Sequence, residues 1–214
     1  KLNQASWLTT GQIRRYFFPG KNQNAVNKRM RKLLMDDYIS CVRYISTEDH
    51  FFRLTNKSKA TIVNHFSLDP DKVTIPKRLP QNLKHFSAIN DIRRYFEYNL
   101  IQSYGNILLF ASDRDMKKYD CKMKLIPDAL IRLRLKNASQ TRTLNICAEY
   151  DNGTENPGYF AGNKIRNYLK IINEQRTFFG LKPHYILVVV DQQKQMKALM
   201  KHTIRILPFS RLEE

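Results

Sequence analysis

The sequence has few cysteines, and their placement argues against two common ways of stabilising a small fold. It contains only Cys41, Cys121 and Cys147, which lie far apart and show no Cys-x-x-Cys spacing. Structural zinc sites and disulfide frameworks use closely spaced or even-numbered sets of cysteines. Both are therefore disfavoured, and the reducing cytoplasm is the expected location.

Long apolar runs are absent as well. The longest, Tyr185–Val190, has the length of a buried strand and is far shorter than the ~18 residues of a membrane-spanning helix. Residues 1–4 lack the pattern of a signal peptide. No amphipathic stretch combines a broad apolar face with a lysine-rich border, so a membrane-surface role is disfavoured too. We therefore expect no membrane partner.

Several catalytic motifs are missing. There is no Gly-rich phosphate loop, which disfavours NTP hydrolysis, and neither a nucleophile elbow nor an H-E-x-x-H motif occurs. The five histidines are scattered along the chain, whereas a relaxase with a tyrosine nucleophile would need them clustered around a metal.

Acidic residues are scarce relative to basic ones. Lys and Arg number 37 and Asp and Glu 19, so the formal net charge is +18 and the pI is near 9.9. Such self-repulsion is best tolerated when the partner is a polyanion, and double-stranded DNA is the first candidate. The alternative is a soluble surface that is merely basic. With 214 residues, 42% of them hydrophobic, the chain suits a folded protein of one or two domains.

Prolines cluster in one stretch. Pro70, Pro76 and Pro80 each disfavour helix at the preceding residue. We predict a first domain at 1–68, a linker at 69–80 and a second domain at 81–214. Residues 1–66 carry twelve Lys and Arg against four acids, and residues 67–214 carry 25 against 15. The first domain has the higher charge density, so it is the better candidate for the main DNA contact.

The first domain has the element order of a winged helix-turn-helix. Thr9 or Thr10 can cap one helix, and a second helix fits Gln23–Met35. Two β-rich runs, Tyr38–Ile45 and Phe51–Leu54, then form a hairpin, and Thr55 caps a third helix. This order predicts that the second helix enters the major groove.

The polar face of that second helix is the predicted DNA-binding surface. Asn and Arg side chains can read base edges, and Lys can neutralise phosphates. The residues concerned are Asn24, Asn27, Lys28, Arg31 and Lys32. The alternative is a protein-interaction domain whose basic face is only solvated.

The second domain reads as an α/β core in the order αβββαβ. Because a helix connects its last two long strands, these should pair in parallel within a mixed sheet. The expected elements are a helix at Gln81–Ser103, a strand at Asn106–Phe110, a polar turn at Ser112–Lys118, a strand at Cys121–Leu125, a run beginning at Ile126, a strand at Thr143–Tyr150, a helix at Ala161–Arg176, a strand at Tyr185–Val190, a short helix at Lys194–His202 and a strand at Ile204–Pro208.

Acidic residues stand at the ends of these strands. Asp128 follows Pro127 at a strand start, and Glu149 ends another strand, so antiparallel pairing would bring the two carboxylates together. Asp151 would share the face of Glu149 if that strand stays regular. Asp128, Glu149 and Asp151 are therefore candidate ligands of Mg²⁺ or Mn²⁺, which would activate water against a phosphodiester.

Pro-Asp followed by a Glu-x-Lys strand would be the PD-(D/E)xK nuclease signature. Here Asp151 stands where the lysine belongs, and Lys164 in the next helix could substitute for it. The candidate catalytic set is Asp128, Glu149, Asp151 and Lys164. The alternative is that both aspartates are turn or cap residues and that Lys164 is solvated.

Three further polar residues allow two interpretations each. Glu155 is either a further metal ligand or an acid favoured by a helix dipole. His85 is either a general base or a capping or core histidine. Tyr168, one turn after Lys164, either bonds a carboxylate or phosphate or simply packs.

The chain resembles the replication-relaxation family of plasmid and conjugative-element proteins. The resemblance rests on the segments His85–Arg93, Ile126–Ala129 and Ala148–Glu155 and on Lys164 with Tyr168. It implies an N-terminal winged helix joined to a PD-(D/E)xK-like domain, acting in plasmid replication or mobilisation.

Two functions remain open. The first is a metal-dependent DNA endonuclease or nickase, favoured by acids clustered in a strongly basic chain. The second is a non-catalytic DNA-binding protein whose second domain forms a homodimer or binds a relaxase or replication initiator. The missing Glu-x-Lys favours the second.

Overall fold

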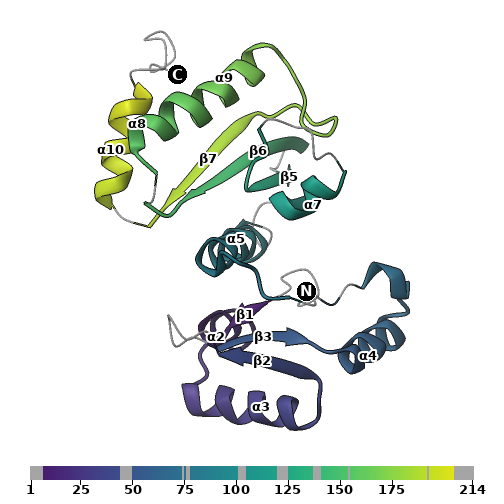
Figure 1. The fold of residues 1–214 in the computed structure, drawn as a ribbon. Helices are drawn as coiled ribbons and strands as arrows, with labels where there is room; N and C mark the ends of the chain where they lie inside the picture. Colours follow the sequence, from purple (N-terminus) through teal and green to yellow (C-terminus); the bar gives the residue numbers. More distant parts are fainter. Residues whose placement is uncertain are drawn as a thin grey trace. The chain divides into compact units, whose positions relative to one another are not determined.

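The computed structural model describes residues 7–43, 50–73, 75, 78–100, 105–119, 125–136, 141–153, 155–191 and 193–204. Contacts between residues divide the chain into two compact units, Lys1–Asp91 and Ile92–Glu214 (Figure 1). Both units combine helices with a sheet, so the chain has the mixed α+β content that a helix-hairpin domain followed by an α/β core requires.

The first unit is built on a three-stranded antiparallel sheet in the order β1-β3-β2. An apolar cluster that includes Leu8, Val26 and Phe52 joins the sheet to its helices. The elements are β1 (Leu8–Thr9), α2 (Thr10–Phe17), α3 (Gln23–Met35), β2 (Ile39–Arg43), β3 (His50–Leu54) and α4 (Asn56–Phe66). The predicted helices and hairpin strands are confirmed, whereas β1 was not predicted. The residues between the two hairpin strands, 44–49, lie outside the described residues.

Side-chain caps set the helix starts in this unit. Thr9 caps α2 in a capping box with Gln12, and Asn22 Oδ1 accepts a hydrogen bond of 2.8 Å from the Ala25 amide at the start of α3. Thr55 caps α4 as predicted. Each cap satisfies amides that the first helical turn leaves without partners.

The predicted linker packs against the first unit. Pro70–Lys72 forms a short 3₁₀ helix, and Val73 is buried. Trp7 Nε1 donates a hydrogen bond of 3.1 Å to the Arg78 carbonyl, and Asn90 in α5 (Leu83–Tyr95) donates one of 2.9 Å to the Trp7 carbonyl. The first part of α5 therefore belongs to this unit, and the two compact units divide between Asp91 and Ile92, inside α5.

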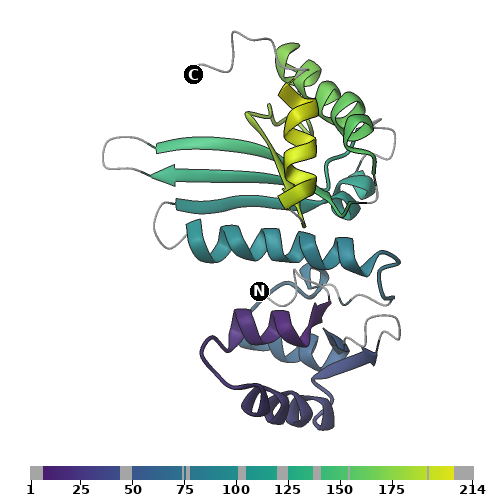
Figure 2. The same ribbon diagram turned by 90° about the vertical axis from the view of Figure 1, so that its left-hand side faces the viewer.

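The second unit contains a four-stranded mixed sheet in the order β4-β5-β6-β7. The first three strands are antiparallel, and β7 is parallel to β6, as the helical crossover predicted. The elements are η2 (Phe96–Leu100), β4 (Gly105–Ser112), α7 (Asp113–Tyr119), β5 (Ala129–Lys136), β6 (Thr141–Asp151), α8 (Pro157–Tyr159), η3 (Phe160–Ile165), α9 (Arg166–Asn173), β7 (Tyr185–Val190) and α10 (Gln193–Ile204). Helices α9 and α10 cover one face of the sheet (Figure 2).

The predicted polar turn at Ser112–Lys118 is wrong, because α7 occupies it. Ser112 Oγ accepts from the Asp115 amide at 3.3 Å and donates to the Asp115 carboxylate at 2.8 Å, which starts the helix. Most of the strand predicted at Cys121–Leu125 lies in 120–124, outside the described residues. Residues 205–208 of the last predicted strand also lie outside them, and Ile204 ends α10.

Gly105 gives a direct test of this packing. A Cβ built there would lie 1.9 Å from the carbonyl oxygen of Arg134, whereas one at Gly162 meets nothing within 4 Å. We expect Gly105→Ala to lower the free energy of unfolding by about 2 kcal/mol or more, because the backbone of β5 must move. Gly162→Ala should be close to neutral in the same urea titration. Equal effects of the two substitutions would contradict the β4–β5 pairing.

Candidate active site

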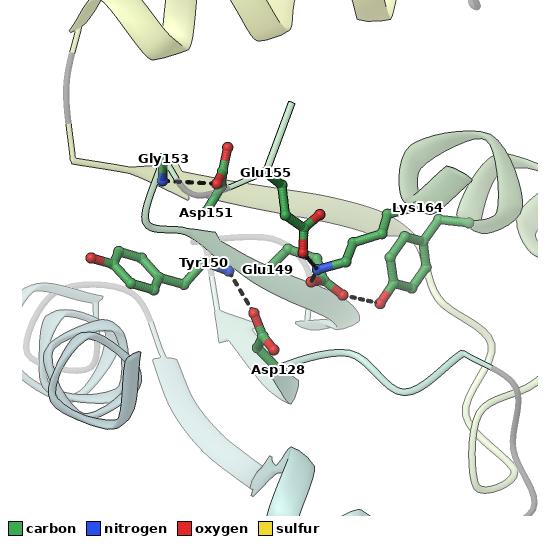
Figure 3. Close-up of polar contacts among 8 residues, drawn as sticks. Asp128, Glu149, Tyr150, Asp151, Gly153, Glu155 and Lys164 are labelled. Atoms are coloured by element: carbon green, nitrogen blue, oxygen red, sulfur yellow. Dashed lines mark hydrogen bonds and ion pairs between the residues drawn. The ribbon is translucent and has the colours of Figure 1, made fainter. Parts of the chain in front are cut away.

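Glu149 is the centre of a buried polar cluster near the end of β6. Its side chain is 2% exposed. One carboxylate oxygen accepts a hydrogen bond from the Tyr168 hydroxyl, and the other lies 3.3 Å from Lys164 Nζ (Figure 3). Lys164 in η3 and Tyr168 in α9 lie four residues apart and reach the same carboxylate. The lysine predicted to compensate for the missing Glu-x-Lys thus contacts the predicted acid.

Lys164 joins two carboxylates. Its Nζ also lies 3.3 Å from Glu155 Oε1, while the other oxygen of Glu155 is enclosed and accepts no hydrogen bond from any described residue. The Lys164 side chain is 29% exposed. The side chain as a whole is therefore partly open to solvent, while its ammonium contacts both carboxylates.

Asp128 lies directly before β5 and is tied to the end of β6. Its Oδ2 accepts a hydrogen bond of 2.8 Å from the Tyr150 amide. Ala129 pairs with Ala148 in the β5–β6 register, so Asp128 faces the end of β6 near Glu149. Asp128 and Glu149 thus converge as predicted, close enough for the Asp128 charge to raise the pKa of Glu149.

Asp151 does not join this pair. It is buried, and its Oδ1 accepts a hydrogen bond of 2.9 Å from the Gly153 amide, which closes the turn after β6. Figure 3 shows its carboxylate apart from the Lys164 ammonium. Over the described part of the chain, no three His, Cys, Asp or Glu residues are grouped to hold a metal ion. The predicted three-carboxylate set is therefore not assembled; Asp128 and Glu149 remain as a pair of hard oxygen donors.

Burial dominates the electrostatics of the cluster. Burial and the Asp128 charge raise the pKa of Glu149 to about 7, although Tyr168 and Lys164 oppose the shift. Burial and the Glu149 charge raise the pKa of Tyr168, so its hydroxyl stays a hydrogen-bond donor. Burial lowers the pKa of Lys164, but the charges of Glu149, Glu155 and Asp128 outweigh it and raise that pKa overall. The site therefore keeps a cation beside an acid that titrates near neutrality.

The raised pKa of Glu149 predicts a pH-dependent stability difference. The ordinary pKa of this carboxyl is 4.5. Its contribution to the stability of the folded protein is therefore fully present below pH 4.5 and is lost as the pH rises through about 7. Without added metal, the stability of the wild type relative to Glu149→Gln should fall by up to about 3 kcal/mol over this window. Urea unfolding of both proteins across the window measures the difference. A difference that does not change with pH would show that the carboxyl titrates normally.

The predicted DNA-binding residues lie on one side of α3. Asn24, Lys28, Arg31 and Lys32 are exposed, while Val26 and Met30 on the other side are buried.

Asn27 is half-buried in a hydrogen-bonded chain that the sequence did not reveal. Its Oδ1 accepts from Gln23 at 2.8 Å, and Gln23 accepts from Arg14 of α2 at 3.1 Å. Asn27 is thereby oriented by α2, and the other four residues remain accessible.

A family model described as replication-relaxation matches residues 1–180. The chain belongs to the replication-relaxation family. Membership gives this replication-relaxation protein a role in replication or mobilisation. No curated protein and no solved structure matches the chain. Among the described residues of this chain, no helix is long and apolar enough to span a bilayer.

Proposed function

We propose that this replication-relaxation protein binds double-stranded DNA of a plasmid or mobile element, and that α3 is its recognition helix. The observation that carries the proposal is the exposed side of α3, where Lys28, Arg31 and Lys32 stand together with no acid among them. Three cations on one helix side can neutralise phosphates, and Asn24 and Arg31 can reach base edges.

The topology of the first unit supports this role. The order β1, α2, α3, β2, β3 with a β1-β3-β2 sheet is consistent with a winged helix, in which the helix before the hairpin would enter the major groove. The buried side of α3 anchors the helix on the sheet through Val26 and Met30. Its DNA-facing side is thereby held on a rigid support.

Groove competition tests this docking mode. We expect the major-groove ligand methyl green to displace the full-length protein from a DNA duplex, because α3 would occupy that groove. The minor-groove ligand distamycin should displace it far less. Fluorescence anisotropy of a labelled duplex reports both competitions, and displacement by distamycin alone would contradict the proposal.

A second candidate function is metal-dependent nicking of DNA by the second unit. The specific observation that favours it is the 3.3 Å contact between Lys164 and Glu149, which supplies the lysine missing from the strand. Asp128 and Glu149 would hold Mg²⁺ or Mn²⁺, an ion held in many proteins by only one or two carboxylates. When bound, such an ion polarises the phosphodiester and activates water.

The chain's own residues would then position the reaction. Tyr168 fixes the orientation of the Glu149 carboxylate through its hydroxyl. Lys164, partly exposed, would stabilise negative charge that develops on the phosphate. If nicking is absent, the second unit would instead serve for dimerisation or for binding a relaxase or replication initiator.

A further inference from the structure

One face of β5 carries a row of cations. Arg132, Arg134 and Lys136 occupy alternate positions, so their side chains leave the same face of the strand, about 6.8 Å apart. The register with β6 has no shift, which keeps this alternation intact. Leu130, one step earlier on the same face, packs in the cluster of Cys147 and Tyr168. The row therefore lies on the face of the sheet that also carries Glu149.

No acid balances this row within the described structure. Arg134 and Lys136 are exposed, and none of the three cations forms an ion pair with a described residue. Their partners on β6 are polar and uncharged: Asn145, Thr143 and Thr141. By contrast, Lys117, Lys118 and Lys170 elsewhere in the unit each contact an acid. The row is thus an uncompensated strip of positive charge.

Arg132 also carries an unused donor. Its Nε is enclosed, and no described residue accepts a hydrogen bond from it. An enclosed donor of this kind is costly unless a ligand or water supplies the acceptor. A phosphate oxygen is such an acceptor, and guanidinium groups bind phosphates well.

The helices leave this part of the sheet open. Figure 2 shows β4, β5 and β6 extending beyond α9 and α10, which cover the other end. The opposite face of β5 is apolar and buried at Ile131 and Leu133. The basic row is therefore the face of the strand that solvent reaches.

We propose that Arg132, Arg134 and Lys136 form a second DNA contact that holds the phosphate backbone of one strand. This inference rests on the proposed DNA binding and adds that the second unit contacts DNA directly. Threonine hydroxyls beside the cations are further phosphate donors. Asn145, opposite Arg132, is four residues from Glu149, about 13 Å along β6, so the held strand would pass near the Glu149 cluster.

Neutralising the row tests the proposal. The full-length triple variant Arg132→Gln, Arg134→Gln, Lys136→Gln is compared with Lys170→Gln, Lys194→Gln, Lys197→Gln, which removes the same charge from α9 and α10. We expect the row variant to bind a DNA duplex about 10- to 100-fold more weakly, with the slope of log affinity against log salt shallower by about 2 to 3. The control should stay within about twofold of the wild type.

The outcomes separate the two proposals. No salt-dependent DNA binding by the wild type would overturn the proposed function itself. Wild-type binding with equal affinities for the row variant and the control would overturn the second contact alone. The second contact would also be overturned if the row variant lost binding to phosphatidylserine vesicles while its DNA affinity stayed unchanged, because the row would then bind a membrane surface. The charge-retaining variant Arg132→Lys, Arg134→Lys should keep most of the affinity, which separates loss of charge from loss of folding.

Discussion

Replacing Lys28, Arg31 and Lys32 together with glutamine is expected to weaken DNA binding about 100-fold at moderate salt. These side chains are exposed on α3, so the substitutions remove charge without removing packing. Each lost phosphate contact reduces counterion release, and the salt slope should become shallower by about 3. Fluorescence anisotropy with a labelled duplex at several salt concentrations gives both quantities.

The charge-matched control for this variant is again Lys170→Gln, Lys194→Gln, Lys197→Gln. If general positive charge were responsible for binding, both triple variants would lose affinity equally, and the α3 proposal would be wrong. If α3 is the recognition helix, the thermal unfolding of its variant should match the wild type while the affinity collapses. Substitution of Arg31 alone should also reduce discrimination between duplex sequences, because arginine reads base edges.

Removing both carboxylates of the second unit is expected to abolish nicking. The variant Asp128→Asn, Glu149→Gln keeps the shape of both side chains but removes the charges that would bind Mn²⁺. Nicking of supercoiled plasmid should fall by at least about 100-fold, to background, and calorimetry should show no Mn²⁺ binding. Asp151→Asn is the matched control, because Asp151 Oδ1 accepts the hydrogen bond of the Gly153 amide in the turn after β6.

DNA affinity separates the possible outcomes of that experiment. It should be unchanged or slightly higher in the double variant, since two acids are removed from a basic protein. Nicking that persists in the double variant would place the activity elsewhere. A wild type that binds DNA but neither binds Mn²⁺ nor nicks would make the second unit a non-catalytic platform.

The local elements of the first unit could be predicted from sequence because their signals are short-range. Thr9, Asn22 and Thr55 cap helices, and the apolar residues of α3 repeat at helical spacing. The strand β1 could not be predicted, because two residues are too short to show alternation. It exists because Leu8 and Thr9 pair with β3, a contact that joins residues more than forty positions apart.

The division between the units depends on long-range contacts in the same way. The proline-rich stretch 69–80 has the composition of a linker, but Val73 is buried. The Trp7 side chain donates a hydrogen bond to the Arg78 carbonyl, and the Trp7 carbonyl accepts one from the Asn90 side-chain amide. Hydrogen-bond partners 71 and 83 residues away leave no periodic signal in the sequence.

The candidate site was predicted in part. Strand order was sufficient to bring Asp128 towards Glu149, and helical spacing was sufficient to bring Lys164 and Tyr168 to one carboxylate. Asp151 was predicted as a third ligand from strand alternation, which gives only the face on which its side chain lies. Its side chain is instead used by the turn after β6, where Gly153 adopts a positive φ of 80°.

The most direct test of the account is the affinity of the full-length wild type for a DNA duplex over a range of salt concentrations. The account predicts tight binding at low salt and a linear fall of log affinity with log salt, with a slope that reflects at least the three cations of α3. Absence of binding at low salt, or an affinity indifferent to salt, would contradict it.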